Sequence, residues 1–101
     1  MWRPTEDHDQ EIRHWMEARG WPVTRTNYDF SREIYAWRQD VAGGPSPTLR
    51  MSQKVLEDYP AWALMHHLKE LKVAQALRSR PDAPLVVVQN GPRVTLEEAL
   101  G

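Results

Sequence analysis

The chain of 101 residues contains no cysteine. Disulfide bonds, thiol catalysis and cysteine-liganded zinc are therefore excluded, and the absence suits a reducing compartment. The sequence also lacks the dinucleotide-binding fingerprint and the G-x-S-x-G motif of serine hydrolases. The pair Gly43-Gly44 is not followed by the lysine and hydroxyl residue of a phosphate-binding loop, so we expect it to lie in a hairpin loop.

Long hydrophobic runs and an excess of one charge are missing as well. No apolar run approaches the ~20 residues of a membrane-spanning helix, and the start M-W-R-P-T-E-D-H-D has no signal-peptide core. We therefore expect a cytoplasmic protein with no membrane partner. The formal charge of −1 predicts no polyanion partner from bulk electrostatics. A hydrophobic share of 41% and a charged share of 27% are typical of one globular domain, which we place over residues 1–101.

Apolar residues recur with a helical spacing in some segments and at every second residue in others, which indicates helices and strands respectively. Ile12, Trp15 and Met16 lie on one helical stripe between a capping pattern at Asp7 and Gly20. The expected elements are, in order, a helix at 7–19, strands at 23–30, 31–41 and 48–52, a helical turn at 52–59, a helix at 61–78 and a strand at 85–89. After the Asn90-Gly91 turn, residues 93–96 either pair back as a strand or give way to a short helix capped by Thr95.

The order α-β-β-β-α-β predicts an α+β fold. We expect a small, mostly antiparallel sheet of three to four strands, with two main helices packed on one face. This order is similar to that of the double-stranded-RNA-binding fold, whose second helix begins with basic residues that straddle a groove. The corresponding helix here begins P-A-W-A-L-M, without those residues, so the likeness covers the order of elements only.

The stretch S-R-E-I-Y-A-W-R-Q, residues 31–39, carries apolar side chains on both faces of a predicted strand. Tyr35 and Trp37 together hold several times the apolar area of the residues that alternate with them. Burial stabilises the fold by ~25 cal/mol per Å² of apolar area. Leaving both aromatic rings in water would therefore lose a large amount of folding free energy. We therefore predict that Tyr35 and Trp37 face the helices, together with Leu49 and Met51 of the next strand.

The opposite face of the sheet would then carry the candidate binding residues, which are all arginines. They are Arg25, Arg32, Arg38 and Arg50. Guanidinium groups suit both phosphate oxygens and carboxylates. Alternatively, these arginines are solvated or pair with Asp40 and a neighbouring glutamate. A register shift of one residue would instead make Tyr35 and Trp37 the binding residues, as a stacking platform for single-stranded bases or a dimer contact.

The histidines do not have the spacing of metal ligands. His66 and His67 are adjacent and point about 100° apart on a helix. His8 and His14 are six residues apart, which is again a poor helical spacing for a shared metal. We therefore expect no metal site and no cofactor.

These observations favour a small non-catalytic interaction module. It would present the arginine-bearing sheet face to a protein partner or to another copy of itself as a homo-oligomer. The second hypothesis is a nucleic-acid-binding protein that uses the same arginines, for which binding would weaken steeply with salt. An enzyme whose site is assembled from distant residues is the third hypothesis.

Overall fold

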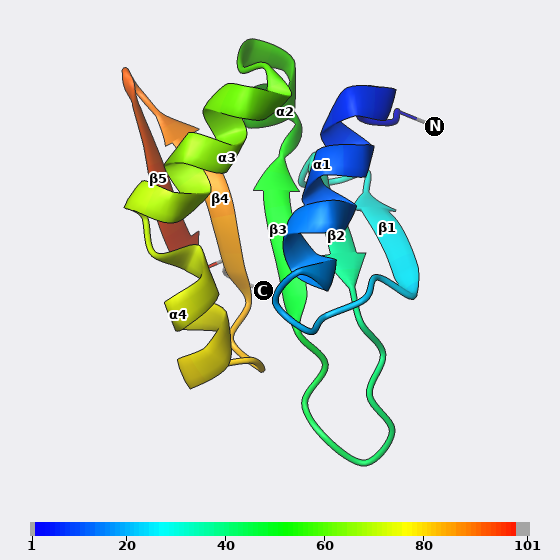
Figure 1. Ribbon diagram of the computed structural model, residues 1–101. Coiled ribbons are helices and arrows are strands. Elements are labelled where there is room, and N and C mark those ends of the chain that lie inside the picture. Colours follow the sequence, from blue (N-terminus) through cyan, green and yellow to red (C-terminus); the bar gives the residue numbers. More distant parts are fainter. Residues whose placement is uncertain (1, 99–101) are drawn as a thin grey trace.

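The computed structural model describes residues 2–98 as a five-stranded sheet with four helices on one of its faces (Figure 1). The helices are α1 (Glu6–Glu17), α2 (Gln53–Asp58), α3 (Ala61–Glu70) and α4 (Val73–Ser79). The strands are β1 (Arg25–Asp29), β2 (Ile34–Arg38), β3 (Thr48–Ser52), β4 (Leu85–Asn90) and β5 (Arg93–Glu98). The predicted α+β class is confirmed. The structure has more strands and more helices than the three to four strands and two main helices that the sequence predicts.

The strands lie in the sheet in the order β1-β2-β3-β4-β5. Three neighbouring pairs are antiparallel, whereas β3 and β4 are parallel. The parallel pair arises because α2, α3 and α4 carry the chain back along the sheet before β4 begins. After β4, Gly91 adopts a φ of 64°, which glycine tolerates without strain, and the chain turns back. Residues 93–96 are therefore a strand and not a short helix.

Helix α1 begins one residue before the predicted range of 7–19, and its cap lies two residues before the predicted cap at Asp7. Its N-cap is Thr5, whose Oγ1 accepts a hydrogen bond of 3.2 Å from the backbone N–H of His8. Asp7 instead joins Glu6 and Asp9 in the first turn, where acidic side chains interact favourably with the helix dipole.

Strand β2 is shorter than the predicted strand at 31–41. Residues 30–33 form the turn from β1, and Glu33 adopts a left-handed φ of 55°. The Asp29 carboxylate holds this turn by accepting hydrogen bonds from the backbone N–H groups of Ser31 at 3.1 Å and Arg32 at 3.2 Å. Because the local hydrogen bonds of Asp29 satisfy this backbone, Arg32 belongs to a turn and not to the strand.

The predicted helix at 61–78 is divided in two at Lys72, which has a φ of 55°. The Leu71 N–H donates to the His67 carbonyl, and the Lys72 N–H donates to the Lys69 carbonyl, so two of the last carbonyls of α3 are satisfied at the break. The change of direction lets α4 bury Val73 and Leu77 in the core.

Replacing Lys72 with glycine is expected to raise the free energy of unfolding by about 0.5–1 kcal/mol. The left-handed conformation is costly for a residue with a Cβ atom, and the exposed Lys72 side chain loses no core contact. Urea denaturation would measure the change. Lys69→Gly is the matched control, because Lys69 lies in regular helix and should lose about 0.5–1 kcal/mol. An equal loss in both variants would contradict the strained position of Lys72.

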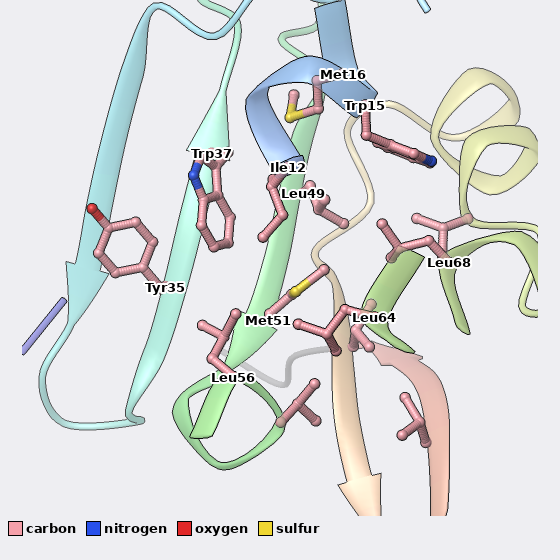
Figure 2. Packing of buried hydrophobic residues seen from close by; sticks show 14 of the residues in the cluster. Ile12, Trp15, Met16, Tyr35, Trp37, Leu49, Met51, Leu56, Leu64 and Leu68 are labelled. Carbon is pink, nitrogen blue, oxygen red and sulfur yellow. The ribbon is translucent and has the colours of Figure 1, made fainter. Parts of the chain in front are cut away.

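The core lies between the sheet and the helices (Figure 2). Trp37 and Met51 are 0% exposed, Leu49 is 2% exposed and Tyr35 is 8% exposed, which confirms that these side chains face the helices. The indole N–H of Trp37 donates a hydrogen bond of 2.9 Å to Asp9 Oδ1, so its polar atom is satisfied inside the core. Strands β4 and β5 add Val87 and Val94 to this core. The helices contribute the large buried side chains of the other layer, namely Ile12, Trp15, Met16, Val55, Leu56, Leu64, Leu68, Val73 and Leu77. Within residues 2–98, no helix is long and apolar enough to cross a membrane.

Candidate functional site

The face of the sheet that the helices leave open carries the arginines. Arg25 of β1 lies directly opposite Arg38 of β2, and Arg50 of β3 lies opposite Ala36 of β2. Because side chains on paired strands point to the same face at each opposed position, these three arginines share one face. Arg32 joins them from the β1–β2 turn and lines a hollow with Arg50. We call these four residues the arginine face.

Asp40 lies between two of the arginines. Its Oδ1 accepts a hydrogen bond of 2.9 Å from Arg25 Nη2 and lies 2.8 Å from Arg38 Nε. The Arg38 Nε contact is an ion pair by proximity, because its geometry does not make a hydrogen bond. Thr24 also donates to Asp40, with an Oγ1 to Oδ2 distance of 3.2 Å. This carboxylate relieves the repulsion between two arginines that lie opposite each other on neighbouring strands.

Asp29 is the second carboxylate on this face. Its Oδ2 lies 3.9 Å from Arg32 Nε. The hydrogen bond from the Ser31 hydroxyl is the main cause that lowers the pKa of Asp29, and the Arg32 charge and the turn's backbone N–H groups act in the same direction. Pairing with Asp40 was anticipated from the sequence, but the second partner is Asp29 and not a glutamate.

Arg50 differs from the other three arginines. Within residues 2–98, no carboxylate oxygen lies within 4.0 Å of its guanidinium. Its side chain is half-buried, and burial lowers its pKa, with the positive charge of Arg38 acting in the same direction. An arginine remains protonated at neutral pH despite such a shift. Arg50 is therefore a partly desolvated positive charge without a neutralising group in the described chain.

Two hollows of about 350 and 300 Å³ adjoin Arg50. Both are lined by Asn27, Ala36 and Arg50, so they are neighbours on the open face. The small side chain of Ala36, between the longer Ile34 and Arg38 on the same face of β2, leaves this space. The first hollow is also lined by Arg25, Thr26, Arg38 and Thr48, and the second by Asp29, Arg32, Ile34 and Pro84. The sequence did not point to Asn27 or Pro84, because their position depends on strand pairing.

The two aromatic candidates lie on the other side of the sheet. Tyr35 is 8% exposed and Trp37 is 0% exposed, and their ring centroids are 4.9 Å apart in the core. Figure 2 shows both rings among the buried side chains. They therefore cannot stack on a ligand that occupies the open face. A register shift that exposes them is excluded, since Tyr35 pairs with Met51 and Trp37 pairs with Leu49.

The histidines are dispersed over the fold. His8 is buried, with Nε2 2.6 Å from the Tyr59 carbonyl oxygen, whereas His66 pairs with Glu70 on the surface of α3. In the part of the chain that the structure describes, no three histidine, aspartate or glutamate side chains converge as metal ligands would. The structure thus offers the arginine face as the site best supported by its geometry.

Comparison of this chain with known protein families, curated proteins and solved structures finds no match. A function for this chain is therefore inferred from the residues of the arginine face.

Proposed function

We propose that this protein is a small non-catalytic interaction module whose arginine face binds a carboxylate-bearing segment of a partner protein. The observation that supports this proposal best is Arg50, a half-buried guanidinium with no carboxylate within 4.0 Å among the described residues. A half-buried charge is stabilised when an opposite charge approaches it, and the fork of arginine matches the two oxygens of a carboxylate.

The shape of the face favours side chains as ligands. The two hollows beside Arg50, of about 350 and 300 Å³, adjoin each other along Asn27, Ala36 and Arg50. Each could receive one acidic side chain of an extended segment. The rim arginines Arg25 and Arg38 share the single carboxylate of Asp40, so a second carboxylate would find an arginine there too.

Nucleic acid is the second candidate partner, because phosphate oxygens also bind arginine forks. Two observations make nucleic acid a weaker candidate than a carboxylate-bearing protein segment. The four arginines face the two carboxylates of Asp29 and Asp40, so the surplus is only two positive charges. The aromatic rings that would stack on single-stranded bases are buried.

The proposal predicts that a fluorescein-labelled oligoglutamate peptide binds the protein at low salt and that Arg50→Gln weakens this binding at least about tenfold. One charge-assisted arginine–carboxylate contact is worth ~1.5–3 kcal/mol, which corresponds to about tenfold or more in affinity. Fluorescence anisotropy would measure both affinities, and urea denaturation would show that Arg50→Gln remains folded.

Lys69→Gln is the matched control, because it removes one positive charge from the exposed surface of α3 and should leave the affinity unchanged. Equal affinities of the wild type and Arg50→Gln, or no binding at low salt, would refute a carboxylate site on the arginine face. An oligothymidylate of equal length tests the second candidate. Tighter binding of the oligothymidylate than of the peptide, with a log–log salt slope of about −2 to −3, would transfer the proposal to nucleic acid.

A further inference from the structure

Strand β5 leaves one edge of the sheet without a partner. Its residues Arg93–Glu98 pair with β4 on one side, and among residues 2–98 no strand pairs with its other side. Figure 1 shows β5 as the outermost strand on the left of the sheet, with α3 passing in front of it. An open edge presents a row of backbone donors and acceptors to any strand that can approach.

The side chains of β5 alternate in a pattern that is complementary to a second β5 strand running in the antiparallel direction. The face shared with the arginines carries Arg93, Thr95 and Glu97, which lie opposite Asn90, Val88 and Val86 of β4. The face toward the helices carries Val94, which is buried, and Leu96, which packs against the core. When two such strands run antiparallel with Thr95 opposite Thr95, each Arg93 lies opposite a Glu97 and each Val94 lies opposite a Leu96.

We propose that β5 pairs in the antiparallel direction with β5 of a second copy of this chain, centred on Thr95. Arg93 of each copy would lie opposite Glu97 of the other, which gives two ion pairs on one face. Val94 would lie opposite Leu96 of the other copy, which gives two apolar pairs on the helix side. The dimer would contain one continuous sheet, and both arginine faces would lie on the same side of it.

The charges on this edge are available for a partner. Within the described chain, Arg93 has no carboxylate within 4.0 Å, and Glu97 has only a long contact of 3.5 Å from Asn90 Nδ2.

The charge pattern also determines the register. Centring the pairing on Val94 places Arg93 opposite threonine, and centring it on Leu96 places Val94 opposite Glu98. Only the arrangement centred on Thr95 sets opposite charges against each other on both sides of the axis. Charged residues on an edge normally discourage pairing with foreign strands, so the same residues would exclude other partners and admit a second copy.

The opposite edge, β1, is less suited to a second copy. Its Arg25 and Asp29 would also alternate about Asn27, but Arg25 already pairs with Asp40 and Asp29 already accepts hydrogen bonds from the Ser31 side chain and backbone. The ring of Trp2 also packs against Tyr28 of β1, with centroids 5.7 Å apart. On the β5 edge, Arg93 has no such internal partner among residues 2–98.

Light scattering coupled to size-exclusion chromatography tests this pairing over a range of protein concentrations. The wild type should approach twice the 11.8 kDa mass of one chain at high concentration. Arg93→Glu and Glu97→Arg should each raise the dissociation constant at least about tenfold, because two attractive pairs become two repulsive pairs. Mixing the two variants should restore a mixed dimer, since every opposed pair is then again one positive and one negative charge.

Lys69→Glu is the control for an equal charge reversal elsewhere, on α3, and should dimerise like the wild type. A wild type that stays monomeric at high concentration would overturn the proposal, as would variants that dimerise unchanged or a mixture that fails to associate although circular dichroism shows both variants folded. If either single variant does not fold, the double variant Arg93→Glu/Glu97→Arg decides, because it should dimerise alone. The arginine face is unchanged in all these variants, so failure here is distinguishable from failure of carboxylate binding.

Discussion

Replacing Trp37 with alanine is expected to lower the free energy of unfolding by about 3–5 kcal/mol. The indole is 0% exposed, packs against Tyr35 with centroids 4.9 Å apart, and donates its N–H to Asp9 at 2.9 Å. The substitution would leave a cavity between β2 and α1 and would remove the donor to Asp9 Oδ1, while Arg13 Nε still donates to Asp9 Oδ2. Because a protein of this size has a total stability of about 5–15 kcal/mol, a large part of it would be lost.

Urea denaturation followed by far-ultraviolet circular dichroism would measure this loss without relying on tryptophan fluorescence. Trp62→Ala is the matched control, since Trp62 of α3 is 77% exposed and its removal should change the stability by less than about 0.5 kcal/mol. Trp37→Phe keeps a buried ring and loses the hydrogen bond to Asp9, so we expect an intermediate loss of about 1–2 kcal/mol. Similar losses for Trp37→Ala and Trp62→Ala would show that Trp37 is not a core residue.

Replacing His8 with alanine is expected to cost about 2–3 kcal/mol. His8 is 6% exposed and joins α1 to the connection between α2 and α3, through a contact of 2.6 Å between Nε2 and the Tyr59 carbonyl oxygen. With hydrogen on Nε2, the ring donates to this carbonyl, and Nδ1 accepts a hydrogen bond from the Thr5 hydroxyl. Alanine would leave the Tyr59 carbonyl without its partner in a partly buried position.

His14→Ala offers a direct comparison, because it is the same substitution on an exposed position of the same helix. It should change the stability by less than about 0.5 kcal/mol in the same denaturation experiment. A loss for His8→Ala no larger than that for His14→Ala would mean that the contact with Tyr59 contributes nothing to stability.

Which side chains of β2 and β3 face the core could be predicted from the sequence, because the two faces of β2 differ greatly in apolar area. The apolar area of Tyr35 and Trp37 exceeds that of the residues between them, and their burial follows from it. The same period of two placed Leu49 and Met51 in the core. That the arginines share one face then followed from alternation alone, apart from Arg32, which the turn beside Asp29 removed from the strand.

Other features had no local pattern to reveal them. The break at Lys72 interrupts a continuous apolar stripe with no glycine or proline at the break, because burying Val73 and Leu77 outweighs the cost of one left-handed residue. The parallel pairing of β3 and β4 depends on where three helices return the chain, which no window of sequence contains. His8 has the sequence surroundings of an ordinary surface residue, and only the arrival of the Tyr59 carbonyl from far along the chain makes it a buried one.

The strand order has a consequence for how the chain folds. Because each strand lies beside the strand made just before it, three of the four pairings join segments separated by nine residues at most, such as 39–47 between β2 and β3. These pairings close small loops at little entropic cost. Only the meeting of β3 with β4 must bring together segments separated by residues 53–84. The conformational search during folding is therefore concentrated in one event, the closure of the helical crossover, and we expect the folding rate to depend mainly on that step.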